Sequence, residues 1–264
     1  MSQTDLALSA RGVQMEYRDR TSQKALLAIE SIDLDVSDGE FVSLVGPSGC
    51  GKSTFLKIVN GLLRATAGEI RLRKVQKGRE NAMVFQDSAL FPWYSVIDNI
   101  AYGLVCSGVS RREARKRALP FIGLVGLDGF ADKYPYQLSG GMQQRANLAR
   151  ALAVDAAVLL MDEPFASLDA QTREVMQAEL LRIWHAARKT VVFVTHQIDE
   201  AVYLADRVVV MAARPGRVLA DIPIGLGRPR ALAVKRTSEF QKYTEQIWQL
   251  IASQHQQAPQ AEAP

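Results

Sequence analysis

Residues 46–54 read Gly-Pro-Ser-Gly-Cys-Gly-Lys-Ser-Thr and fit the pattern G-x-x-x-x-G-K-[ST]. The apolar run 41–45 before them is typical of a buried parallel strand, and the run 54–60 after them has helical spacing. A glycine-rich turn between a strand and a helix points backbone N–H groups at phosphate oxygens, and the helix adds its positive end. The stretch therefore predicts a loop that binds a nucleoside triphosphate, and this context disfavours a turn without chemical purpose.

Three side chains of this loop have expected properties. Lys52 would reach the β- and γ-phosphates, and Ser53 would ligate Mg²⁺. Cys50 lies beside Lys52, among N–H groups that point inward and before a helix, and these surroundings favour the thiolate. We therefore expect Cys50 to react quickly with alkylating reagents and to be protected by nucleotide.

The composition is that of an ordinary globular protein. Hydrophobic residues make up 48% of the 264 residues and charged residues 23%, which excludes a disordered or fibrous chain. The net charge is only +4, and the basic segment 68–79 lacks interleaved aromatic residues, so we expect a solvated hairpin edge there and no nucleic-acid partner. Two cysteines fit a reducing compartment, and we expect neither a secretory signal nor a membrane-spanning segment.

Strands are predicted before the loop at 6–8, 13–17 and 32–36, and we expect them to be antiparallel. Tyr17 ends the second of these strands. Its ring could pack in the sheet or could face an adenine base, and the residues leave both interpretations open.

Three apolar strands are each followed by polar side chains of possible catalytic use. The strand 82–86 ends in Gln86, 156–161 leads into Asp162 and Glu163, and 190–195 leads into His196. Ligands of such sheets bind at the carboxyl ends of the strands, so we expect these side chains near Lys52. Asp162 would hold Mg²⁺, Glu163 would orient or deprotonate a water, and His196 would sense the γ-phosphate. The alternatives are an exposed Gln86 without a role, carboxylates of Asp162 and Glu163 that merely emerge at the surface, and a satisfied core histidine at His196.

The segment 138–145, Leu-Ser-Gly-Gly-Met-Gln-Gln-Arg, is predicted to open a helix with Ser139 as its N-cap. Two glycines in a first helical turn are locally costly. Their presence indicates that backbone N–H groups approach an anion there, which makes this a second candidate phosphate contact.

The segment 89–94 carries three aromatic residues around Pro92 and is either core or a docking surface. Helices are predicted at 96–107, 111–125 and 171–187, with a basic, solvated face on the second. A closing helix is predicted at 240–251, followed by a disordered tail over 253–264.

Together, these motifs resemble the nucleotide-binding subunit of ATP-binding cassette (ABC) transporters, from about Val13 to Arg230. The resemblance implies an α/β fold of ABC ATPase type, with a P-loop NTPase (RecA-like) core, an antiparallel β subdomain and an inserted α-helical subdomain. It implies an ABC ATP-binding domain at 1–225, with its core at 1–86 and 151–225 and its helical subdomain at 87–150. Residues 226–264 would be a carboxyl-terminal extension.

The resemblance also implies ATP and Mg²⁺ as cofactors and assigns roles to the site residues. The implied catalytic residues are Lys52, Gln86, Glu163 and His196. The implied metal ligands are Ser53, Gln86 and Asp162. The implied nucleotide contacts are Tyr17, Gly46, Pro47, Ser48, Gly49, Cys50, Gly51, Lys52, Ser53, Thr54, Ser139, Gly140, Gly141, Gln144 and Asp169.

The family further implies partners. Two copies would meet head to tail, with Ser139 and Gly141 of one copy covering the γ-phosphate held by the other. The helical subdomain would receive a transmembrane permease on the cytoplasmic side of the plasma membrane, indirectly served by a periplasmic or lipoprotein solute-binding protein.

The segments 85–93, 164–173 and 213–217 are similar to those of bacterial nitrate, sulfonate and taurine importers. Gln197, where that branch often has an acidic residue, and the short basic segment 69–82 depart from the pattern. The alternatives are a soluble ABC ATPase that acts on ribosomes or DNA, which would usually have two cassettes or a coiled-coil insertion, and a phosphate-loop kinase, which would not need the segment 138–141.

Overall fold

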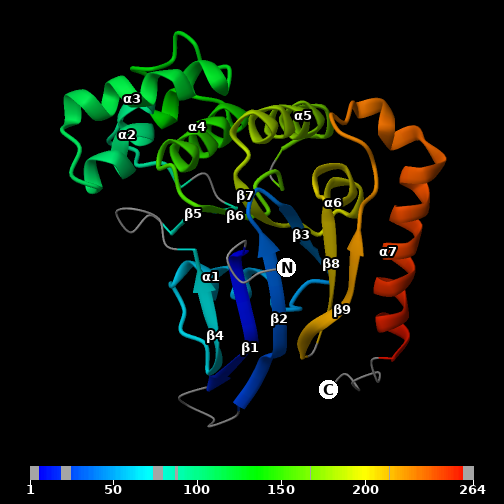
Figure 1. Ribbon diagram of the computed structural model, residues 1–264. Helices are drawn as coiled ribbons and strands as arrows, with labels where there is room; N and C mark the ends of the chain where they lie inside the picture. The colour runs from blue at the N-terminus through cyan, green and yellow to red at the C-terminus, as the bar shows by residue number, and fades with distance from the viewer. Residues whose placement is uncertain are drawn as a thin grey trace, which may run out of the picture. The chain divides into compact units, whose positions relative to one another are not determined.

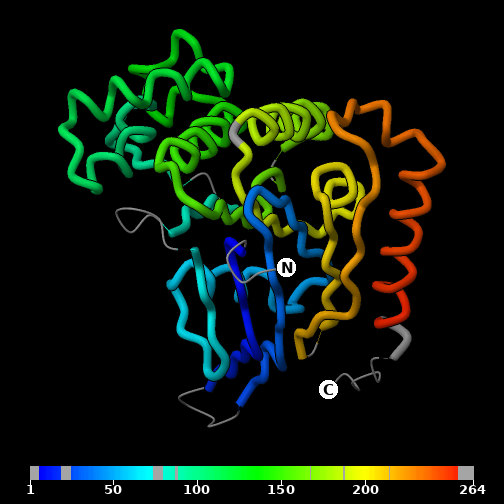
Figure 2. The backbone as a smooth tube through the Cα atoms, viewed as in Figure 1, coloured from blue at the N-terminus to red at the C-terminus, as the bar shows by residue number. Residues whose placement is uncertain are grey.

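The computed structural model describes residues 6–18, 25–73, 80–86, 89–166, 168–213 and 215–257 (Figures 1 and 2). The chain forms two compact units: Met1–Arg71 with Val192–Pro264, and Leu72–Val191. Outside the described residues lie the part of the predicted hairpin edge at 74–79, Ser167, and the end of the predicted tail at 258–264. Among the residues that are described, no helix is long and apolar enough to cross a membrane.

A mixed sheet forms the centre of the first unit, in the strand order β4-β1-β2-β9-β8-β3-β7. Its strands are β1 Leu6–Arg18, β2 Ala25–Ser37, β3 Phe41–Val45, β4 Ala67–Leu72, β7 Thr190–Val194, β8 Arg207–Ala212 and β9 Gly216–Pro223. β1 pairs with β2 antiparallel, as predicted, whereas β3 pairs with β8 parallel. The strand predicted at 32–36 is confirmed and lies within the longer β2. The prediction of separate strands at 6–8 and 13–17 is wrong, because both segments belong to the continuous strand β1.

Burial along the strands follows the sequence pattern. β3 and β7 are apolar runs, and every residue in them is buried, as expected of strands covered on both faces. The rings of Phe41 and Phe193 join these two strands, with centroids 5.8 Å apart. β1 and β2 instead alternate between buried and less buried positions, which is typical of strands with one face toward solvent.

The helices of the first unit are α1 Lys52–Asn60, α6 Ile198–Leu204 and α7 Ser238–Gln257, with a 3-10 turn at Leu232–Arg236. α7 confirms the predicted closing helix but extends beyond it. The prediction of a disordered tail from Ser253 onward is wrong for 253–257, because the Gln and Ser residues there continue the helix at small cost.

Arg230 ties the carboxyl-terminal part of the chain to the end of α6. Its buried guanidinium donates hydrogen bonds to the carbonyl oxygens of Val202, Tyr203 and Ala205 at 3.1, 3.0 and 2.7 Å. Burial lowers the pKa of Arg230 to about 10. The guanidinium therefore occupies the place of a helix cap, where carbonyl groups have no intrahelical partner.

The second unit contains two parallel strands and a group of helices (Figure 1). Its elements are β5 Asn81–Val84, β6 Val158–Asp162, α2 Val96–Cys106, α3 Arg111–Leu124, α4 Gly140–Ala153, α5 Ala170–Ala187 and a 3-10 turn at Pro135–Gln137. α2 packs against α3 and α4. β5 ends at Val84, so Gln86 lies in the bend after the strand rather than at its last position.

The basic face of α3 is solvated, as predicted. Arg111 and Arg115 both pair with Asp98, and Arg117 pairs with Glu113 one helical turn away. These exposed pairs satisfy the charges within the unit and contribute little to stability.

Candidate functional site

The predicted phosphate loop connects β3 to α1, which confirms the strand-loop-helix arrangement. Gly51 is the N-cap of α1 and has a φ of 91°, a value that side chains rarely allow. A Cβ atom at Gly51 would lie 2.9 Å from Cγ1 of Ile29, and one at Gly46 would lie 2.5 Å from the carbonyl oxygen of Met211. The neighbouring strands, β2 with Ile29 and β8 with Met211, therefore require glycine at these two positions.

Lys52 and Cys50 both turn toward the interior of the loop. Nζ of Lys52 donates to the carbonyl oxygens of Gly46 and Pro47, at 2.7 and 3.0 Å, and lies 3.4 Å from Sγ of Cys50. Cys50 is fully buried. Burial shields its thiol, so the structure does not support the expected rapid alkylation, and only the backbone of Cys50 is placed to serve the loop.

Gly216 packs against the backbone of the loop, and no sequence motif indicates this role. A Cβ atom there would lie 2.3 Å from the carbonyl oxygen of Cys50 and 2.9 Å from that of Ala28. Gly216 starts β9 and pairs with Ile29 of β2. The Pro-Gly pair at 215–216 predicted only a turn, and nothing in its spacing indicated contact with a loop more than 150 residues earlier.

Tyr17 lies near the end of β1 with 39% of its surface exposed, and its hydroxyl is 3.5 Å from Oγ1 of Thr54 in α1. The ring is therefore next to the phosphate loop and not in the sheet's core. Contact with adenine remains a prediction.

His196 follows β7 and is exposed. The backbone N–H of Thr195 donates to the carbonyl oxygen of Leu44 at 3.2 Å, so the end of β7 lies beside the end of β3, which leads into the loop. The first unit thus brings together Tyr17, the loop and His196.

Asp162, Glu163 and Gln86 share an edge of the second unit. Asp162 is buried at the last position of β6, and Gln86 is exposed two residues after the end of β5, its parallel neighbour. Glu163 has a φ of 45°, which is uncommon for a residue other than glycine. Such backbone conformations persist only where the surrounding structure holds them in place, and they cluster at functional sites.

The segment from Ser139 to Gln144 opens α4. Oγ of Ser139 accepts a hydrogen bond from the backbone N–H of Met142 at 3.3 Å, which confirms the predicted N-cap. No atom lies within 4 Å of the position of a Cβ at Gly140, whereas one at Gly141 would lie 3.3 Å from Cγ2 of Thr172. Gln144 is buried, so the structure gives no support to its predicted contact with nucleotide.

Asp169 is the N-cap of α5 and accepts a hydrogen bond from the backbone N–H of Thr172 at 3.0 Å. Hydrogen bonds from the side chain and backbone of Thr172 hold the pKa of Asp169 below its usual range. Arg173 donates to the carbonyl oxygens of Leu168 and Phe165, at 2.7 and 3.3 Å, and so fixes the segment after Glu163. No sequence motif indicates this role of Arg173.

An aromatic cluster formed by Phe91, Trp93, Tyr94 and Tyr102 is held by one buried amide. Nδ2 of Asn99 donates to the carbonyl oxygens of Phe91 and Tyr94, at 3.2 and 3.0 Å, and its Oδ1 accepts from the N–H of Phe91 at 2.8 Å. Trp93 is 67% exposed, with its ring centroid 5.6 Å from that of Phe91. The structure therefore rejects a core role for Trp93 and gives it a fixed, exposed position.

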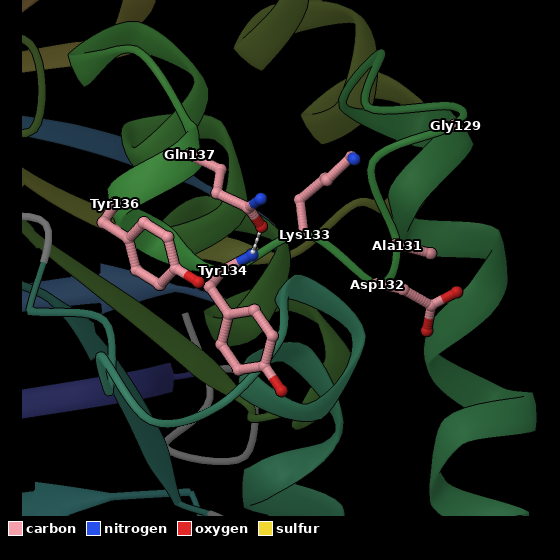
Figure 3. Close-up of a pocket in the computed structure, with 7 residues that line it drawn as sticks. All are labelled: Gly129, Ala131, Asp132, Lys133, Tyr134, Tyr136 and Gln137. Carbon is pink, nitrogen blue, oxygen red and sulfur yellow. Dashed lines mark hydrogen bonds between the residues drawn. The ribbon is translucent and has the colours of Figure 1, made fainter.

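A hollow of about 410 Å³ is lined by residues between 129 and 137, which come shortly before Ser139 in the sequence (Figure 3). The rings of Tyr134 and Tyr136 stack beside it, with centroids 5.8 Å apart and planes 13° apart. Oε1 of Gln137 accepts a hydrogen bond from the N–H of Tyr134 at 2.8 Å. No sequence motif indicates this pair of rings.

The structure resembles solved ATP-binding cassettes. One of them, a dimer in a post-hydrolysis state bound to ADP and Pi, superposes with a TM-score of 0.72 at 31% identity and covers 83% of this chain and 100% of its own. This similarity confirms the predicted α/β fold of ABC ATPase type.

Curated relatives match most of the chain. An ABC transporter ATP-binding protein of Methanocaldococcus jannaschii is 50% identical and covers 85% of this chain and 84% of its own. The taurine import ATP-binding protein of Rhizobium johnstonii is 46% identical, covering 86% and 89%, and the nitrate import ATP-binding protein of Synechocystis is 40% identical, covering 90% and 92%. The family described as ABC transporter matches residues 29–166. With the phosphate loop and the Asp162–Glu163 strand both inside the matched region, this chain belongs to the ABC transporter family.

Proposed function

We propose that this chain hydrolyses ATP to power the import of a small solute through a membrane permease, with taurine, other sulfonates and nitrate as the foremost candidates. The observation that carries the proposal is the phosphate loop between β3 and α1, in a chain 46% identical to a taurine import ATP-binding protein and 40% identical to a nitrate import one. A soluble ABC ATPase that acts on ribosomes or DNA is not favoured, because these relatives are named for import.

The loop residues 46–54 would hold the phosphates of ATP. The backbone N–H groups at the start of α1 supply fixed donors, and Lys52 can exchange its present carbonyl partners for phosphate oxygens. The exposed ring of Tyr17 beside Thr54 offers a face on which adenine can stack.

Mg²⁺ would be held by Ser53, Gln86 and Asp162. The residues present fit this ion: their hydroxyl, amide and carboxylate oxygens are the hard donors that Mg²⁺ prefers. When bound, Mg²⁺ would neutralise charge on the phosphate oxygens.

Glu163 would orient or deprotonate the attacking water, and His196 would donate a hydrogen bond to the γ-phosphate. The left-handed backbone of Glu163 and the Arg173 hydrogen bonds behind it support a carboxylate held in one orientation. Hydrolysis would require these groups to act on one ATP molecule.

A second copy of the chain would complete each site head to tail. The capped start of α4 and the open space at Gly140 support the close approach of a nucleotide held by the partner, with Ser139 and Gly141 covering its γ-phosphate. Asp169 would lie at the same boundary. The similar solved cassette is a dimer, which agrees with this assembly.

The aromatic cluster supports docking of the permease on the proposed helical subdomain, 87–150, between core segments 1–86 and 151–225. An exposed tryptophan on a backbone fixed by Asn99 is typical of an interface anchor. This arrangement would place the chain at the cytoplasmic face of the plasma membrane, and a solute-binding protein would deliver solute to the permease from the other side.

The experiment is uptake into proteoliposomes that contain the full chain, its permease and its binding protein. We expect ATP-dependent uptake of taurine, an alkanesulfonate or nitrate, and none with the Glu163→Gln variant. Hydrolysis that no permease stimulates, together with recovery of the chain on ribosomes or DNA, would overturn the proposal in favour of the soluble alternative.

A further inference from the structure

The turn that carries His196 is built around one buried hydroxyl group. Oγ1 of Thr195 donates a hydrogen bond to Oε2 of Glu200 and accepts one from the backbone N–H of Gln197 at 3.0 Å. Thr195 and Glu200 are only 1% and 3% exposed. A single hydroxyl thus joins the residue before His196, the residue after it and a buried carboxyl group of α6.

Two backbone hydrogen bonds extend this arrangement. The N–H of Thr195 donates to the carbonyl oxygen of Leu44 at the end of β3, and the carbonyl oxygen of Gln197 accepts from the N–H of Ala201 in α6. The chain on each side of His196 is therefore fixed, whereas the imidazole itself is exposed. This contrast is expected where a scaffold presents one side chain to a ligand.

We propose that Thr195 and Glu200 are positioning residues that hold the imidazole of His196 toward the γ-phosphate of ATP. The inference rests on the proposed function, in which His196 contacts that phosphate. Without the Thr195 hydroxyl, the turn would lose the hydrogen bonds to Glu200 and to the N–H of Gln197. The imidazole would then sample orientations in which it cannot donate to the phosphate.

A purely structural role would have a different signature. The N-cap of α6, Gln197, makes no side-chain capping hydrogen bond. In a purely structural role, the Thr195–Glu200 pair would therefore stabilise this short helix and do nothing else. A structural pair would affect the melting temperature alone. A positioning pair would also lower kcat in protein that remains folded, and would leave the affinity for ATP unchanged.

The experiment compares Thr195→Val, which keeps the shape and removes the hydroxyl, with Thr195→Ser, which keeps the hydroxyl. We expect Thr195→Val to lower kcat for ATP hydrolysis about tenfold or more, because small displacements of positioned groups can cost up to about a hundredfold. Its Kd for ATP should stay within about twofold, and Thr195→Ser should restore most of the rate. A wild-type kcat in folded Thr195→Val would overturn the inference.

Thr190→Val is the matched control. It makes the same chemical change at another buried threonine, at the opposite end of β7. We expect it to lower the melting temperature without changing kcat of the folded protein. An equal loss of kcat in both valine variants would show a general effect of buried threonines and would overturn the inference.

A double variant tests whether the effect passes through His196. If it does, Thr195→Val should cause no further loss in a His196→Ala background, since coupled residues are not additive. Additive losses would overturn the inference. Near-normal hydrolysis by His196→Ala alone would instead overturn the role of His196 in the proposed function, so the two failures are distinguishable.

Glu200→Gln carries the test if Thr195→Val does not fold. The amide keeps the side chain's volume and an acceptor oxygen, but a neutral acceptor forms a weaker hydrogen bond than a carboxylate. We expect a loss of kcat of about threefold to tenfold with unchanged ATP affinity. An unchanged kcat in this variant would overturn the inference.

Discussion

Two glycine-containing turns lead into helices that carry candidate phosphate contacts, and they differ in why they contain glycine. Before α1, Gly46 and Gly51 are required by the protein itself, because a Cβ atom at either would collide with Met211 or Ile29. In the first turn of α4, Gly140 has open space around its Cβ position, and Ser139 caps the helix with its side chain. Contacts within the fold explain Gly46 and Gly51 but do not explain Gly140, for which we propose contact with the partner's nucleotide.

The largest expected effect concerns Glu163 in the second unit. It distinguishes ATP binding, proposed for the phosphate loop of the first unit, from ATP hydrolysis. We expect Glu163→Gln to retain ATP affinity and to lose turnover by on the order of a hundredfold or more, because water needs a positioned carboxylate whereas binding does not. The variant should accumulate as an ATP-bound dimer. Steady-state hydrolysis and size-exclusion chromatography with ATP check this, and near-normal hydrolysis would remove Glu163 from its role.

The next effect concerns the aromatic cluster of the second unit. Trp93→Ala should weaken association with the permease by about 2 kcal/mol, or roughly thirtyfold in Kd, because exposed aromatic anchors contribute strongly at interfaces. Because Trp93 is exposed, hydrolysis and melting temperature of the isolated chain should not change. Pull-down titration and calorimetry measure both, and an inactive or unfolded isolated variant would contradict the docking role.

Gly216→Ala tests whether backbone contact fixes the phosphate loop. The added methyl group would meet the carbonyl oxygens of Cys50 and Ala28, and overpacking of this kind costs about 1–3 kcal/mol. We expect ATP affinity to fall about tenfold, with a lower melting temperature. Gly227→Ala is the control, since no atom lies within 4 Å of its Cβ position. Equal affinities for the two variants would show that the loop does not depend on Gly216.

The smallest effect tests the second turn. Gly140→Ala should change the free energy of unfolding by less than about 1 kcal/mol, and toward greater stability, because alanine favours a helix over glycine. Hydrolysis by the dimer should nevertheless fall severalfold, because in the proposed dimer the methyl group would face the partner's nucleotide. A clear drop in melting temperature would show that the fold needs Gly140 after all and would remove the contrast between the two turns.

Local patterns in the sequence predicted much of the fold and the candidate site. The loop at 46–54 and the Ser139 cap depend on neighbouring residues, and apolar runs identify buried strands such as β3 and β7, so all of them could be recognised without coordinates. The Arg230 cap and the Gly216 contact join residues far apart in the chain. No periodicity reports such contacts, because they depend on which strands become neighbours.

Burial explains the remaining differences. Cys50 and Gln144 lie in motifs that predict contact with phosphate, but the structure buries both side chains. A motif fixes the course of the backbone, whereas the direction of each side chain depends on the elements packed around it. Trp93 is the reverse case, a residue that the structure exposes. The aromatic segment around it fitted either core or surface, and the sequence did not distinguish the two.

The Arg230 cap has a consequence for where the chain can be shortened. Arg230 lies beyond residues 29–166, the segment that the ABC transporter family matches, yet its guanidinium donates hydrogen bonds to the carbonyl groups at the end of α6. α6 begins two residues after His196. A truncation before Arg230 would therefore open the helix that follows the histidine, even though it leaves every family motif intact. The shortest form of the chain that keeps α6 capped therefore includes Arg230, which belongs to none of the nucleotide-site motifs.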